Sequence, residues 1–148
     1  MEIQQDFKEL LELFNAHKVK YLIVGGYALA FHGAPRYTGD IDIYVKPDAE
    51  NAKHILNALE EFGFGSAGLM EEDLKTLNKV VQLGFPPVRI DIITSISGVS
   101  WDDAFKKHEE GVYGDIPVYY IGKEHYVINK RASGRRKDLA DLEALGEE

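Results

Sequence analysis

Apolar side chains along this chain recur at two periods, one typical of helices and one typical of strands. Within residues 4–16 they return every three or four positions, which predicts an amphipathic helix. Residues 21–24 form a short apolar run of the strand type that ends at Gly25 and Gly26. Residues 27–31 then predict a brief helix.

The middle of the chain continues this alternation of strands and helices. Residues 40–45 alternate polar and apolar side chains, as in a half-buried strand. A helix is expected over residues 48–62, with Asp48 as its N-cap. Residues 79–83 and 88–94 predict two strands joined by a tight turn.

The remaining elements follow from capping residues and turn residues. Short helices are expected over residues 71–77 and 100–107, and a second hairpin over residues 112–121. Residues 123–145 predict helical structure with a break at Ser133-Gly134. Because no repeat, low-complexity tract or linker interrupts residues 1–148, we expect one α+β domain, a small mixed sheet flanked by helices.

Composition narrows the class of protein further. With 148 residues, of which 45% are hydrophobic and 28% charged, the chain has the profile of an ordinary globular domain. No apolar stretch approaches the ~20 residues of a membrane span, and the acidic start does not fit a signal peptide. The absence of cysteine excludes disulfides, thiolate zinc sites and cysteine nucleophiles, and we expect a cytoplasmic protein without a membrane partner.

The net charge of −8 makes a nucleic-acid groove an unfavourable first hypothesis, because an acidic surface repels long polyanions. Residues 130–137 depart from this average, with five cations in eight positions. Such a cluster could hold a compact anion, or it could be the solvated end of a helix.

The candidate chemistry begins with Asp40 and Asp42. Residues two apart in a strand face the same side, roughly 6.6 Å apart, so the two carboxylates share one face. Adjacent carboxylates repel each other unless a cation or proton lies between them, and hard divalent cations prefer such oxygen ligands. The alternative is the polar face of an exposed edge strand.

A second strand and a glycine pair extend this pattern. In residues 88–92 the apolar side chains take one face, while Arg89 and Asp91 take the other. If this strand lies beside the first, Asp91 can join Asp40 and Asp42; the alternative is an Arg89–Asp91 surface pair. Gly25 and Gly26 end one strand and open a helix, where backbone amides can approach a phosphate closely.

Together, the strand with Gly25-Gly26, the thirteen-residue spacer, Asp40-Ile41-Asp42 and the later Asp91 resemble the DNA polymerase β-like nucleotidyltransferase superfamily. The stretch before the acids, with Arg36 and Thr38, is similar to small stand-alone bacterial and archaeal members. So is the tail over residues 130–142. These members are related to abortive-infection and toxin–antitoxin nucleotidyltransferases. The resemblance spans about residues 20–142 and implies the minimal nucleotidyltransferase fold.

The resemblance implies roles for the three acids. Asp40 and Asp42 would bind two Mg²⁺ or Mn²⁺ ions, and Asp91 would be the third metal ligand and the candidate base. Gly25 and Gly26 would hold the triphosphate of a nucleotide such as ATP.

Other residues are candidates for contacts with the nucleotide. Arg36 and Lys137 are the best candidates for phosphate contacts, although Arg36 could equally pair with a nearby acid. Thr38 could orient Asp40 or the nucleotide. A haloacid-dehalogenase phosphatase fits less well, because that class has threonine where Tyr44 stands.

Two functional hypotheses follow. The first is an enzyme that transfers a nucleoside monophosphate from a triphosphate to the hydroxyl group of a small molecule, a protein side chain or an RNA end. The second is a nucleotide-binding module without catalysis, or one component of a toxin–antitoxin pair. Because we expect no separate acceptor-recognition domain within residues 1–148, a second copy or a partner protein could complete the site in either case.

Overall fold

The computed structural model describes residues 3–35, 38–64, 68–85 and 88–147. A six-stranded mixed sheet has the strand order β3-β4-β2-β1-β6-β5. Its strands are β1 (Tyr21–Val24), β2 (Asp40–Val45), β3 (Val80–Phe85), β4 (Val88–Ile93), β5 (Glu109–Tyr113) and β6 (Ile116–Tyr120). The helices are α1 (Gln5–Ala16), α2 (Gly25–Phe31), α3 (Ala49–Leu59), the π-type turn η1 (Glu60–Phe64), α4 (Glu71–Lys75), α5 (Trp101–Lys106), α6 (Lys123–Ser133) and α7 (Arg136–Ala144).

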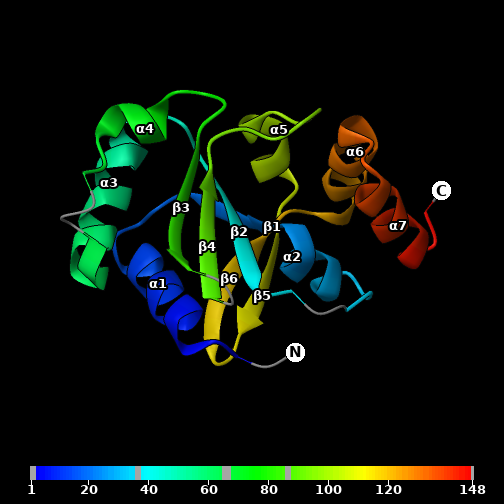
Figure 1. Ribbon diagram of the computed structural model, residues 1–148, viewed down its shortest axis with the longest axis horizontal. Coiled ribbons are helices and arrows are strands. Elements are labelled where there is room, and N and C mark those ends of the chain that lie inside the picture. Colours follow the sequence, from blue (N-terminus) through cyan, green and yellow to red (C-terminus); the bar gives the residue numbers. More distant parts are fainter. Residues whose placement is uncertain (1–2, 36–37, 65–67, 86–87, 148) are drawn as a thin grey trace.

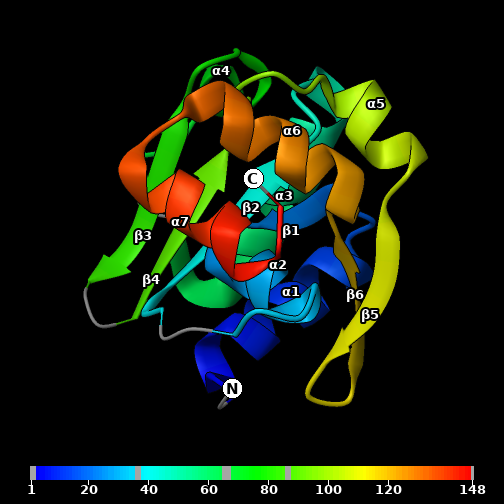
Figure 2. The same cartoon turned by 90° about the vertical axis from the view of Figure 1, so that its right-hand side faces the viewer.

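Helices cover both faces of this sheet, which confirms the expected α+β class. Figure 1 shows α1 and α3 on one side of the strands and α6 and α7 on the other. Figure 2 looks from the side of α6 and α7, which lie in front of the sheet. On β2, Ile41 and Ile43 are fully buried while Asp40 and Asp42 are partly exposed, as expected for alternating side chains.

Local sequence signals account for most helix ends. The side chain of Asp48 accepts a hydrogen bond from the Asn51 amide at 2.7 Å, which confirms it as the N-cap of α3. Ser100 caps α5 in the same way. The helix expected over residues 48–62 instead ends at Leu59 and continues as η1, in which Gly63 has a positive φ of 107°.

Two other boundaries differ from expectation for tertiary reasons. Strand β3 extends to Phe85, past the expected end at residue 83, because Gly84 pairs with Arg89 of β4. Strand β5 begins at Glu109, where two consecutive glutamates gave no strand signal, because pairing with β6 supplies its backbone partners. Both strands lie at edges of the sheet, where charged side chains are common.

The sheet topology brings together residues that are distant in sequence. Strand β2 lies between β1, which is antiparallel to it, and β4, which is parallel to it. The register pairs Asp42 with Val24 on one side and with Asp91 on the other. The end of β1, where Gly25 follows, therefore lies directly beside the acidic residues of β2 and β4.

No helix in the described ranges has both the length and the apolar character needed to cross a membrane.

Candidate active site

Two of the three predicted acids stand side by side on neighbouring strands. Asp42 of β2 and Asp91 of β4 are partners in a parallel register, so their side chains leave the same face of the sheet. Asp91 is nearly buried, with 7% of its surface exposed. Asp40 lies on the same face, but its partner across the strands is Arg89. The expected pairing of the two strands is therefore observed.

The closeness of the acids perturbs the ionisation of Asp42. Burial, followed by repulsion from Asp91 and Asp40, raises the pKa of Asp42 to about 6, while the Lys130 ammonium acts in the opposite direction. At neutral pH this carboxylate is therefore ionised at a cost in free energy, which a nearby cation would offset.

Arg89 provides a positive charge to the other two acids. Its Nη2 donates to Asp40 Oδ2 at 2.8 Å and to Asp91 Oδ2 at 3.2 Å. Its Nε lies 3.1 Å from Asp91 Oδ1, but that contact is misaligned and neither atom makes a hydrogen bond there. The pair between Arg89 and Asp91 that the sequence left open therefore exists, and it extends across the strands to Asp40.

The oxygens of Asp42 and Asp91 suit a divalent cation. Asp91 Oδ1 is buried and accepts no hydrogen bond from the described residues, which is unusual for a carboxylate oxygen. Together with the unfavourable ionisation of Asp42, this orphaned oxygen suits a hard cation between the two strands. As the side chains stand, however, no group of three or more acidic or histidine residues in the described ranges is arranged to hold a metal ion. Asp40 is engaged by Arg89 instead.

The glycine turn lies against these acids. A Cβ built on Gly25 would come within 2.2 Å of Asp42 Oδ2, and the φ of Gly25 is +66°, so both space and backbone require glycine here. A Cβ on Gly26 would lie 3.0 Å from the Thr38 methyl group. The Thr38 hydroxyl donates to the backbone oxygen of Asp40 at 3.1 Å. Thr38 therefore fixes the backbone at the start of β2.

A cavity of about 210 Å³ opens beside Asp42 and Gly25. Three elements form it: the end of β1, the loop after β4, and the junction of α6 with α7. Its other lining residues are Val24, Ile93, Ser95, Ile96, Ser97, Asn129, Lys130, Ser133 and Arg135. Its walls thus carry hydroxyl groups and two cations next to a carboxylate.

Buried ion pairs hold the cationic wall of this cavity. The Lys130 ammonium lies 3.1 Å from Asp138 Oδ1 and 3.6 Å from Asp141 Oδ2, and all three residues are buried. Burial alone would raise the pKa of Asp138, but hydrogen bonds from Arg135, Ser133 and Lys130 outweigh it and hold that pKa well below its usual range. This network fixes α7 against α6 and places Lys130 within electrostatic reach of Asp42.

The cationic side chains that line the cavity differ from the phosphate-contact candidates predicted from the sequence. Lys137 is exposed on α7 and does not line the cavity, whereas Lys130 and Arg135 do. Arg36 lies outside the described residues. The spacing of Lys130, Asp138 and Asp141 was the signal in the sequence that could have identified Lys130. With a helix break at Gly134, this spacing places Lys130 on one helix and the two acids on the facing side of the next helix.

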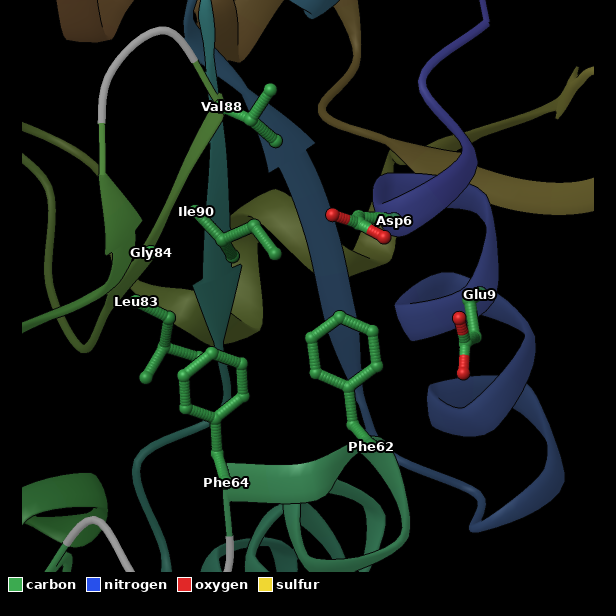
Figure 3. Close-up of a pocket in the computed structure, with 8 residues that line it drawn as sticks. All are labelled: Asp6, Glu9, Phe62, Phe64, Leu83, Gly84, Val88 and Ile90. Carbon is green, nitrogen blue, oxygen red and sulfur yellow. The ribbon is translucent and has the colours of Figure 1, made fainter.

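A second cavity, also of about 210 Å³, lies on the opposite face of the sheet. Figure 3 shows Val88 and Ile90 of β4 pointing toward Asp6 of α1 and the ring of Phe62. None of the three predicted acids lines this cavity, and its floor is apolar. The acid-bearing face is therefore the candidate active site.

The parallel β2–β4 pair with facing acids lies beside a strand that ends in a glycine turn, as expected from the resemblance of the sequence. Residues 1–146 match a family described as nucleotidyltransferase of unknown function (DUF6036), and the chain belongs to this family. A comparison with curated proteins found no match.

Solved structures agree on the fold. One is TM1012 from Thermotoga maritima, a protein assigned to the nucleotidyltransferases, with a TM-score of 0.63 and 17% identity over 93% of this chain and 88% of that chain. Another is the lincosamide antibiotic adenylyltransferase LnuA bound to lincomycin, with a TM-score of 0.55 and 18% identity over 99% of this chain and 98% of that chain. The chain therefore has the nucleotidyltransferase fold.

Proposed function

We propose that this protein transfers a nucleoside monophosphate from a nucleoside triphosphate to a hydroxyl acceptor, with pyrophosphate as the leaving group. The observation that carries this proposal is the direct pairing of Asp42 with Asp91 beside Gly25. A pure binding module has no need for two facing carboxylates of which one is costly to ionise.

In this proposal Asp42 and Asp91 hold divalent cations, Mg²⁺ or Mn²⁺, and Asp40 joins them once it is free of Arg89. The bound ions would neutralise the triphosphate and the charge that develops during transfer. The triphosphate then lies along the glycine turn, where the missing side chain of Gly25 leaves room beside Asp42. Lys130 and Arg135 contribute positive charge from the opposite wall.

The carboxylates also provide the proton acceptor. Asp91 is the candidate base for the attacking hydroxyl, because one of its oxygens is buried and makes no hydrogen bond. Lys130, held by Asp138, opposes the accumulation of negative charge around Asp42. The chain's own residues therefore mainly position and neutralise the reacting groups.

The acceptor we propose is a small molecule with a hydroxyl group. LnuA, which acts on lincosamide antibiotics, is matched over 98% of its length, so a domain of this size can accommodate such an acceptor without a second recognition domain. The cavity beside Asp42 is also lined by hydroxyl and amide groups suited to a polar ligand.

The test uses four nucleoside triphosphates, each labelled at the α-phosphate. Wild-type protein and Asp42→Asn are incubated with Mg²⁺ and separately with the small-molecule, protein and RNA fractions of a cell extract. The control is Glu12→Gln, an exposed carboxylate of α1. Label that enters the small-molecule fraction with wild type and Glu12→Gln, but not with Asp42→Asn, supports the proposal. Magnesium-dependent nucleotide binding without transfer to any fraction would instead support a non-catalytic module.

A further inference from the structure

Arg89 occupies an unusual position for a site that must attract cations. It lies two residues before Asp91 on the same face of β4, and its register partner is Asp40. One guanidinium thus joins the first acid of β2 to the acid of β4, through an Nη2 that lies 2.8 Å from Asp40 and 3.2 Å from Asp91. A guanidinium stays positively charged at any physiological pH.

The contacts of Arg89 divide the three acids unequally. Asp40 and Asp91 have the guanidinium as a direct partner, whereas Asp42 makes no hydrogen bond or ion pair with it among the described residues and interacts with its charge only through space. The misaligned Nε–Oδ1 contact leaves one oxygen of Asp91 without a hydrogen bond. Arg89 therefore neutralises part of the acidic cluster while leaving the Asp42 side of it open.

We propose that Arg89 is an internal counter-ion that competes with divalent cations for Asp40 and Asp91. Release of Asp40 and Asp91 from Arg89 leaves all three carboxylates available to a cation, so Arg89 lowers the affinity of the protein for the metal. The inference rests on the proposed metal site. The side chain of Arg89 is 30% exposed, so it can leave the acids for solvent without disrupting the core.

The test is a titration of the nucleotide-free protein with Mn²⁺. Calorimetry measures the affinity for Mn²⁺, and thermal melts measure the change in melting temperature. Arg89→Gln removes the competing charge and is expected to bind Mn²⁺ about tenfold more tightly than wild type, because one unit charge near the ion is lost. The same variant is expected to melt at a lower temperature without metal, since Asp40 and Asp91 lose their counter-ion. Arg89→Lys keeps the charge and is expected to restore affinity toward that of wild type.

The matched control is Lys53→Gln. This variant removes one positive charge from an exposed position of α3, on the other face of the sheet. It is expected to leave Mn²⁺ affinity unchanged. Wild-type protein offers a measurement that does not depend on a variant: the Nε–H resonance of Arg89 should shift as the protein is titrated to saturation with Mg²⁺, which is diamagnetic and leaves the signal visible.

The outcomes separate the inference from the proposed function. Tighter binding by Arg89→Gln together with a shift of the Arg89 resonance supports the competition. If wild type binds Mn²⁺ and Arg89→Gln binds it equally or more weakly, the inference is wrong and the proposed function stands. If neither protein binds Mn²⁺, with or without a nucleoside triphosphate, both the inference and the proposed metal-dependent transfer are wrong.

Discussion

At the residue scale, the candidate site is marked by an excess of negative charge in a partly buried place. Asp42 faces Asp91 across the strands, and burial with this repulsion raises the pKa of Asp42 to about 6. A group whose ionised form is disfavoured in the folded protein makes that protein less stable at a pH where the group must ionise.

Asp42→Asn is expected to stabilise the metal-free protein at pH 8 by about 3 kcal/mol, at roughly 1.4 kcal/mol per unit of a pKa shift from 3.8 to about 6. Between about pH 4 and pH 6 the folded wild type holds a proton on Asp42 that the unfolded chain has lost, so stability falls as pH rises through this window. Urea unfolding at a series of pH values measures this. The difference between the two proteins should shrink toward zero at pH 4, and Mg²⁺ should stabilise only wild type. A difference that does not change with pH would contradict the prediction.

Gly25→Ala tests the close approach of the glycine turn to Asp42. The new methyl group would meet Asp42 Oδ2 at 2.2 Å and would also require a left-handed backbone, which costs about 1–3 kcal/mol. We expect lower stability and loss of nucleotide transfer. Gly33→Ala is the control, because Gly33 also has a positive φ of 113° but would meet nothing within 4 Å. Gly33→Ala should lose stability and keep activity; equal activity loss in both variants would show that backbone strain alone matters.

At the scale of elements, a side chain of α3 joins this helix to the ends of two strands by hydrogen bonds. The Asn51 side chain of α3 is buried and makes three hydrogen bonds of 2.8–3.0 Å. Two join it to the backbone of Lys20, just before β1, and one to the backbone oxygen of Lys46, just after β2. This amide therefore holds the helix to the end of the sheet remote from Asp42.

Asn51→Ala is expected to destabilise the fold by about 3 kcal/mol, because it leaves buried backbone groups without partners. Asn57→Ala, on the exposed face of the same helix, should change stability by less than about 0.5 kcal/mol. Urea unfolding of both variants measures the difference. Similar losses in the two variants would mean that helix propensity, not the buried amide, determines the effect.

The junction of α6 and α7 depends on a buried ion pair. Asp138→Ala leaves the buried Lys130 ammonium without its closest partner and is expected to cost about 3–5 kcal/mol. The double variant Lys130→Met/Asp138→Leu should recover part of this stability, because it removes both charges of the pair and leaves only the Asp141 carboxylate buried there, but it should not recover nucleotide transfer. Thermal melts and the transfer assay report the two effects separately. Recovery of transfer in the double variant would exclude a role for Lys130 beyond packing.

At the scale of the whole molecule, the acidic balance limits the kinds of partner. With a net charge of −8, the protein should bind duplex DNA more weakly than about 0.1 mM at physiological salt. Fluorescence anisotropy with a labelled duplex measures this. Micromolar binding that weakens steeply with salt would contradict it and would favour a nucleic-acid acceptor over a small molecule.

Much of the fold follows from local patterns. The strand at residues 40–45, the caps Asp48 and Ser100 and the break at Gly134 are confirmed, because periodicity and capping depend on neighbouring residues. The boundaries at β3 and β5 were misplaced, since hydrogen bonds from partner strands extend both elements. Of the candidate site, the alternation within each strand correctly put Asp40 with Asp42 and Arg89 with Asp91.

The sequence by itself determined that the acids share a face of each strand and that a glycine turn ends β1, because these are consequences of chain geometry over a few residues. Only the tertiary structure decided that β4 lies parallel beside β2, in the register that sets Asp91 against Asp42 and Arg89 against Asp40. It also decided that Lys130, rather than Lys137, lines the cavity. The order of the strands and the position of the Lys130 side chain depend on how segments distant in sequence pack together. Patterns among neighbouring residues do not determine that packing.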